Sequence, residues 1–88
     1  MKRSALEITH LEIGHEYLRA KDKFPPFNSF HEGYAVIKEE LDELWDEIKG
    51  GQDKQRMRAE AMQVGAMAMR FMLDLCGEAE DRRALKEK

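Results

Sequence analysis

Residues 39–63 read EELDELWDEIKGGQDKQRMRAEAMQ, and this stretch decides the fold. Two charged segments with helical periodicity flank Gly50-Gly51, the only pair of adjacent glycines in the chain. A glycine pair ends a helix and allows a tight turn. Two helices joined by so short a connection pack side by side and antiparallel. The stretch therefore predicts a helical hairpin with acidic side chains on both of its arms.

The prolines Pro25-Pro26 and the glycine turn divide the chain into three long segments and a short tail. We expect helices over residues 4–22, from a cap at Asn28 or Ser29 to about residue 49, and from about 53 to 76. Ser4 and Glu7 form a capping-box pattern, which favours a helix over a strand for the alternating residues 6–13. Residues 78–88 would form a short charged helix or a frayed tail.

The predicted class is all-α: an antiparallel bundle of three long helices plus a short C-terminal helix, in one domain over residues 1–88. A chain of 88 residues buries only about 60–65% of its unfolded surface, so small domains usually need a disulfide, a metal or a partner. The lone cysteine, Cys76, excludes an internal disulfide. We therefore expect self-association to complete the fold.

Charge and hydropathy narrow the class of protein. The formal net charge is −3 and 38% of the residues are charged, which indicates a cytoplasmic protein and argues against nucleic acid as the main ligand. No apolar run approaches the ~20 residues of a membrane span, and no apolar stretch follows the basic N-terminus as in a signal peptide. We expect no membrane partner.

The second predicted helix carries carboxylates beside its apolar arc. Turning each residue by about 100° gathers seven apolar residues on one arc: Phe30, Tyr34, Ile37, Leu41, Leu44, Trp45 and Ile48. Glu40 lies at the edge of this arc, Glu43 just beyond it and Glu39 further round. A solvated acidic face is the simpler interpretation of such a run, but it does not explain why carboxylates lie so close to the predicted core.

Glu60 is the sharper clue, because it lies inside the apolar arc of the third helix. A buried carboxylate must be paired, neutralised or bound to a metal ion. An ion pair with Arg19, Arg56 or Arg70 is the alternative to a metal site. Gln63, one turn on, could be a metal ligand, a hydrogen-bond partner of a substrate or a half-exposed surface residue.

The opposite side of the third helix is also apolar, with Met62, Ala66, Met69 and Leu73. Since three helices of this length should not cover both of its sides, we predict that this side forms the interface of a homodimer or homotetramer. The small residues Gly65, Ala66 and Ala68 would allow a close helix approach.

Carboxylates from two antiparallel helices suit Mg²⁺, with Mn²⁺ as a substitute. Glu40, Glu43, Glu60 and Gln63 are the predicted ligands, and Glu39 could hold a second ion or polarise water. Phosphates of a substrate need positive groups, and the predicted set is Lys54, Arg56 and Arg58, with Lys49 at the end of the second helix. The alternatives are Lys21, Lys23 and the C-terminal Arg82, Arg83, Lys86 and Lys88. Ordinary surface charge also explains all of these cations. His31 could contact the substrate or serve at the helix start, whereas His10 and His15 are interpreted as structural.

The residues Glu39-Glu40-Leu41-Asp42-Glu43, followed by Glu60-Ala61-Met62-Gln63, resemble the EExxE…ExxD pattern of MazG-like nucleotide pyrophosphohydrolases, of the all-α NTP pyrophosphatase superfamily. Residues 28–37 are similar to a MazG-like subgroup, and the resemblance covers residues 27–75. It implies Mg²⁺-dependent cleavage of nucleoside triphosphates to a monophosphate and pyrophosphate, by helical dimers or tetramers.

By this resemblance Glu39, Glu40, Glu43 and Glu60 would be metal ligands or the base that activates water. Gln63 stands where the motif has aspartate, and a neutral amide binds Mg²⁺ more weakly than a carboxylate. Two other hypotheses therefore stay open. One is a non-catalytic helical module that binds a nucleotide or a protein, and the other is a purely structural bundle in which an arginine pairs with Glu60.

Overall fold

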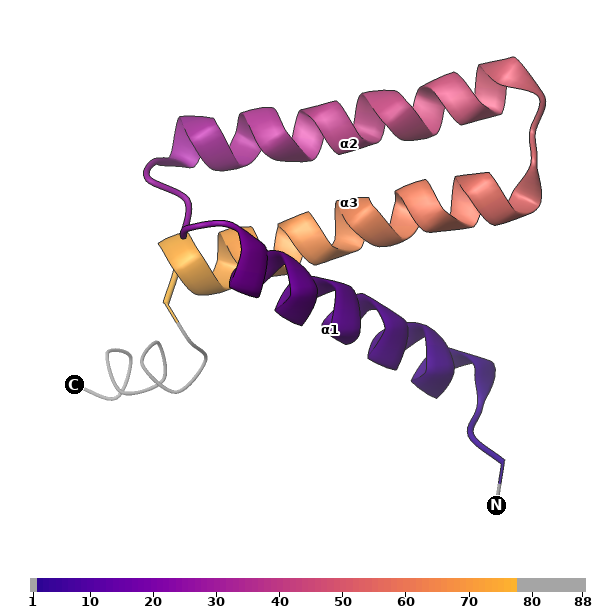
Figure 1. The fold of residues 1–88 in the computed structure, drawn as a ribbon, viewed down its shortest axis with the longest axis horizontal. Coiled ribbons are helices and arrows are strands. Elements are labelled where there is room, and N and C mark those ends of the chain that lie inside the picture. The colour runs from indigo at the N-terminus through magenta and orange to yellow at the C-terminus, as the bar shows by residue number, and fades with distance from the viewer. Residues whose placement is uncertain (1, 78–88) are drawn as a thin grey trace.

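The computed structural model describes residues 2–77, and these form three α-helices and no strand. The helices are α1 (Ala5–Lys23), α2 (Phe30–Gly50) and α3 (Lys54–Leu75) (Figure 1). The all-α class and the three long helices are confirmed, whereas the predicted short C-terminal helix lies outside the described residues. None of these three helices is long and apolar enough to cross a membrane.

Side-chain caps fix where each helix begins. The Ser4 hydroxyl accepts a hydrogen bond from the Glu7 amide at 3.1 Å, and the Glu7 carboxylate accepts one from the Ser4 amide at 3.3 Å. Ser29, rather than Asn28, caps α2, and Asp53 caps α3; each accepts from an amide three residues on. These bonds satisfy amides that the first turn of a helix leaves without partners. The predicted capping box is confirmed.

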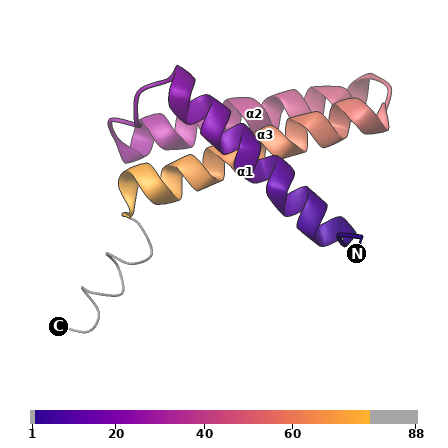
Figure 2. The ribbon, with the colours of Figure 1, turned by 60° about the horizontal axis from the view of Figure 1, so that its bottom comes forward.

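Helix α3 lies between the other two. The glycine turn joins α2 to α3, and the two helices run antiparallel. Helix α1 crosses the other side of α3 obliquely (Figures 1 and 2). Within residues 2–77, α1 and α2 each contact α3 but do not contact each other. The antiparallel hairpin is as predicted, whereas α1 crosses α3 instead of lying along it. Helix α3 therefore lines the space that separates α1 from α2.

Two glycines allow the close approach of the neighbours of α3. A Cβ atom at Gly33 would lie 2.6 Å from the Phe71 ring, and one at Gly65 would lie 3.3 Å from Ile13. The first contact joins α2 to α3 and the second joins α1 to α3. The core beside them is small: its buried apolar residues are Ala20, Phe27, Ala66 and Met67.

The side of α3 predicted to be a subunit interface is partly covered by α1. Ala66 is fully buried, and Met62 and Met69 lie in grooves that α1 shares. The oblique crossing lets α1 pack against Gly65 and cover part of this side, and an interface between subunits at α3 stays a prediction. Only Leu73, at 37% exposure, remains open on this side.

Exposed apolar side chains lie on α1, among them Leu6 and Leu18, and also on α2. Phe30, Tyr34, Leu41 and Trp45 are each more than half exposed, although the helical wheel placed them with the core residues. We call these four residues the α2 strip. The positions of α2 that α3 does cover are Gly33, Val36, Ile37, Glu40, Leu44, Glu47 and Ile48. The packed face is thus turned toward Glu40, and a carboxylate lies in the middle of the contact between α2 and α3.

Candidate metal centre

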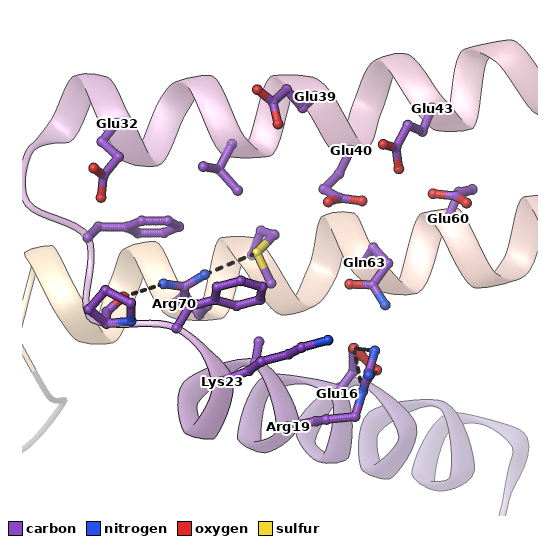
Figure 3. Close-up of a pocket in the computed structure, with 16 residues that line it drawn as sticks. Glu16, Arg19, Lys23, Glu32, Glu39, Glu40, Glu43, Glu60, Gln63 and Arg70 are labelled. Atoms are coloured by element: carbon purple, nitrogen blue, oxygen red, sulfur yellow. Dashed lines mark hydrogen bonds and ion pairs between the residues drawn. The ribbon is translucent and has the colours of Figure 1, made fainter.

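Three carboxylates meet where α2 and α3 pack together. Each of Glu40, Glu43 and Glu60 offers one oxygen, and these oxygens lie within 4.8 Å of one another. We call this group the carboxylate triad (Figure 3). The register that sets Gly33 against Phe71 also brings Glu60 opposite the two α2 carboxylates. Oxygen ligands in such a group suit a hard divalent cation such as Mg²⁺.

Burial and repulsion from neighbouring carboxylates disfavour the charged forms of Glu40 and Glu60. Burial, followed by repulsion from Glu43, Glu60 and Glu39, raises the pKa of Glu40 to about 7. Burial is also the main cause that raises the pKa of Glu60, with Glu43 and Glu47 acting in the same direction. Without a cation, Glu40 and Glu60 therefore bind protons more readily than ordinary glutamates.

Glu60 also has an oxygen with no partner. Its Oε2 is buried, and no hydrogen-bond donor contacts it among the described residues. A buried polar atom without a partner costs about 1–3 kcal/mol, and more if it is charged. The site thus has an unmet demand for a positive group, which is the fit that a metal ion would satisfy.

The alternative of an ion pair at Glu60 finds no support in residues 2–77, because the candidate arginines have other partners. Arg19 binds Glu16 at 2.6 Å, and Arg70 donates to the Pro25 carbonyl at 2.8 Å. Arg56 is not among the residues that line the space beside the triad. The purely structural bundle required such a pair and loses its main argument.

The triad opens onto a cleft of about 590 Å³ between the three helices (Figure 3). Besides the triad, the cleft is lined by Glu16, Arg19, Ala20, Lys23, Phe24, Pro25, Phe27, Glu32, Val36, Glu39, Gln63, Met67 and Arg70. One end is acidic and the other is apolar and aromatic. The acidic end suits divalent cations, and the apolar end suits the apolar part of a ligand.

The predicted acidic site residues all line this cleft. Glu39 is exposed on α2 beside Glu40. Gln63 lies between the triad and Glu16 of α1 (Figure 3). The neutral amide is therefore in the site, one turn from Glu60, as the spacing predicted.

The structure does not bring the predicted substrate-binding residues into the cleft. Arg58 binds Glu12 of α1 at 2.6 Å, and Arg56 lies beside the glycine turn. Lys54 is an exposed residue in the first turn of α3. His31 lies in a shallow apolar hollow on the outer face of α2, beside Tyr34. The cations at the start of α3 lie outside the cleft, so their role in binding a substrate stays a prediction.

Helix α1 contributes Glu16 and Arg19, which were not predicted to bind a substrate, and Lys23, which was predicted only as an alternative cation. Arg19 Nε donates to both oxygens of Glu16, at 3.0 and 3.1 Å, and Nη2 donates at 2.6 Å. This bond to Arg19 is the main cause that lowers the pKa of Glu16, and the Gln63 amide acts in the same direction. The spacing of Glu16, Arg19 and Lys23 places all three on one helix face, next to buried Ala20. That pattern was the available signal.

Arg70 holds the loop that closes the apolar end. Its side chain is 5% exposed, and its guanidinium lies 4.1 Å from the Phe27 ring centroid. It donates to the Pro25 carbonyl, while Asp74 accepts from the Phe27 amide at 3.0 Å. These bonds satisfy the polar backbone of the loop and hold Phe27 against the core.

Comparisons of the chain with protein-family models, with curated proteins and with solved structures find no match. The function must therefore be inferred from the cleft itself. Its informative features are three carboxylates from two helices, a buried oxygen without a partner, and cations that α1 supplies.

Proposed function

We propose that the chain is a Mg²⁺-dependent nucleoside triphosphate pyrophosphohydrolase. It cleaves a (d)NTP between the α and β phosphates and releases a monophosphate and pyrophosphate. The observation that carries this proposal is the buried Glu60 oxygen, which has no partner in the described chain and lies beside Glu40 and Glu43. The MazG-like sequence pattern favours the same reaction.

The residues that would hold the ion are those of the triad, with Gln63 as a weaker neutral ligand. A bound Mg²⁺ would neutralise charge on the phosphates and ease deprotonation of the attacking water. A cation beside Glu40 would also favour its charged form, which opposes the rise in its pKa. The triad is therefore suited to ionise when the ion binds.

Glu39 is the residue we assign to the attacking water. Its carboxylate is exposed, lines the cleft and lies next to Glu40 in the sequence. In the reaction the water oxygen forms a bond to the α-phosphorus, and the bond from that phosphorus to the bridging oxygen breaks. Pyrophosphate leaves with the bridging oxygen, and the proton of the water passes to the carboxylate. Glu40 would position the same water from the buried side.

The apolar end of the cleft provides space for the base and sugar. Phe27 and Met67 are buried there, and Val36 is half-buried beside them. An aromatic and aliphatic wall excludes water from one face of a planar ligand. This arrangement favours a nucleotide over an inorganic polyphosphate.

The direct test measures pyrophosphate release from canonical and modified nucleotides, with Mg²⁺ or Mn²⁺. At least one nucleotide should be cleaved, and Glu40→Gln and Glu60→Gln should abolish the activity without loss of helical circular dichroism. Asp46→Asn is the matched control, because Asp46 is exposed on α2, pairs with Lys49 at 3.7 Å and does not line the cleft. Absence of pyrophosphate from every nucleotide with both metals would refute the hydrolase.

A second candidate is a non-catalytic module that binds a nucleotide or a protein. The observation that favours it is Gln63, a neutral residue within the cleft where the resembled motif has an acid. Calorimetric titration with Mg²⁺ and a non-hydrolysable nucleotide separates the two candidates. Binding without turnover of the parent nucleotide would favour the module.

We also propose that the chain self-associates, through the α2 strip rather than through α3. The four side chains of the strip are 51–64% exposed, and an apolar stripe of this kind marks an interaction surface more often than a free one. Light scattering should show a dimer or tetramer. Trp45→Glu should lower the mass to that of a monomer, whereas a monomeric wild type would refute the proposal.

A further inference from the structure

The charges of the cleft do not favour an anionic ligand by themselves. Six carboxylates and three cations line it, which leaves a formal charge of −3. The carboxylates are Glu16, Glu32, Glu39, Glu40, Glu43 and Glu60, and the cations are Arg19, Lys23 and Arg70. A phosphate chain can enter only with divalent cations, and its far oxygens still need positive partners.

Arg70 is not available for this task. Its side chain is buried, it stacks on Phe27 and it donates to Pro25, with Asp74 at 3.8 Å. Moving this guanidinium toward a ligand would leave the Pro25 carbonyl and the Asp74 carboxylate without their partner. Among the described residues, the other positive groups that line the cleft, Arg19 and Lys23, come from α1.

Arg19 is placed and oriented for an anion. Its side chain is 64% exposed, whereas that of Glu16 is only 11% exposed, so the buried carboxylate holds the exposed guanidinium. Only Nε and Nη2 of Arg19 bind Glu16. Within residues 2–77 the remaining N–H groups have no hydrogen-bond partner, so they can donate to phosphate oxygens, for which the planar guanidinium is well suited.

Lys23 extends the same positive face by one turn of α1. It lines the cleft, and its Nζ lies 5.9 Å from the centroid of the Phe24 ring. None of the ion pairs in residues 2–77 involves this ammonium group. Figure 3 shows Lys23, Arg19 and their helix across the cleft from the triad.

We infer that α1 is the phosphate-binding arm of the site. Arg19, oriented by Glu16, and Lys23 bind the diphosphate unit that becomes pyrophosphate, while the triad holds the metal on the opposite wall. Glu16 is a positioning residue and does not contact the substrate. This inference rests on the proposed function, and it replaces the cations at the start of α3 as the substrate-binding group.

The test uses imidodiphosphate, a non-hydrolysable diphosphate, as the probe. Its binding in the presence of Mg²⁺ is measured by calorimetry for the wild type, Arg19→Gln, Lys23→Gln and the control Lys21→Gln. Lys21 lies on the same helix and does not line the cleft. Binding of Mn²⁺ alone is measured for each protein by electron paramagnetic resonance, and circular dichroism verifies the fold.

We expect Arg19→Gln and Lys23→Gln each to weaken imidodiphosphate binding at least about tenfold, and Lys21→Gln less than about twofold. Mn²⁺ affinity should stay within about twofold in all variants, because none of them alters the triad. Glu16→Gln should weaken binding of the probe. Glu16→Asp keeps a carboxylate that can orient Arg19, so it should restore part of this loss. A Glu16 that only filled space would give no such recovery.

Two outcomes overturn the inference, and they differ. If the wild type binds Mn²⁺ and the probe, and both α1 variants bind the probe equally well, α1 is not the arm and the hydrolase proposal stands. If the wild type binds no Mn²⁺ at all, the metal site itself is wrong, and the phosphate-binding arm is refuted with it.

Discussion

Replacing Glu60 by glutamine should stabilise the chain without a metal ion and should make it less stable than the wild type when the ion is present. In the absence of divalent ions, Glu60 has a buried oxygen without a partner and lies beside Glu40 and Glu43. Glutamine has nearly the same shape and no charge, and its amide can donate to a neighbouring carboxylate. The variant should therefore be more stable than the wild type in a chelator.

The magnitude follows from the geometry. An unsatisfied buried polar atom costs about 1–3 kcal/mol, and the repulsion within the triad adds to this cost. Because glutamine keeps a polar group at the same place, we expect a gain of roughly 1 kcal/mol at pH 8. For a domain of this size that gain raises the Tm by about 4–8 °C.

Saturating Mg²⁺ should make the wild type more stable than Glu60→Gln. A ligand at a hundred times its Kd stabilises the folded wild type by about 2.7 kcal/mol, whereas Glu60→Gln loses a ligand and gains far less. Thermal unfolding followed by circular dichroism, in EDTA and in Mg²⁺ at fixed protein concentration, measures both orders. Asp46→Asn should stay within about 0.5 kcal/mol of the wild type in each condition. The reasoning is refuted if Glu60→Gln is less stable in EDTA, or if Mg²⁺ stabilises it as much as the wild type.

Three further predictions concern pH, packing and the loop. The raised pKa of Glu40, about 7 against 4.5, means that the unfolded chain releases this proton first. The free energy of unfolding without metal should therefore fall as the pH rises from about 4.5 to 7. The fall should be on the order of 1 kcal/mol because the group is partly exposed. Urea titrations measure this trend, and added Mg²⁺ should remove it. Gly33→Ala should cost about 1–2 kcal/mol against the Phe71 ring, whereas Gly14→Ala, with nothing within 4 Å, should gain up to about 1 kcal/mol in the same urea assay. Arg70→Met should cost about 2–3 kcal/mol of unfolding free energy, and it is contradicted if the variant unfolds at the wild-type urea concentration.

Local signals in the sequence predicted the helix boundaries well. The capping box at Ser4 and Glu7, the cap at Ser29 and the glycine turn all act through bonds between near neighbours in the chain. Such bonds do not depend on the rest of the fold. The three carboxylates were found for a related reason, since helical periodicity fixes which residues share a face.

The rotation of α2 could not be predicted in this way. A helical wheel sorts residues by hydropathy, and it assigned the large side chains of the α2 strip to the core. The actual contact is set by Gly33, which has no side chain and lets the Phe71 ring approach. That contact turns Glu40 inward and leaves Trp45 exposed. A close approach at a glycine is a property of two helices together, so one helix does not reveal it.

The proposed role of α1 in binding phosphate also depends on a close approach at a glycine. The crossing of α1 over α3 rests on Gly65 against Ile13, between residues 52 positions apart. Without that crossing, nothing in the sequence separates Arg19 and Lys23 from other surface charges. The predicted cluster at the start of α3 had a stronger local pattern and lies outside the cleft.

Metal binding and folding should be coupled in this chain because the site occupies the packing surface. The carboxylate triad stands where α2 and α3 would otherwise bury apolar side chains, and the core that remains has four buried apolar residues. Repulsion within the triad therefore weakens the α2–α3 contact until a cation relieves it. An ion that relieves this repulsion stabilises the hairpin and prepares the cleft in one step. It follows that variants of the triad must be compared at a stated metal concentration, since we expect the same substitution to stabilise the chain without the ion and to destabilise it with the ion.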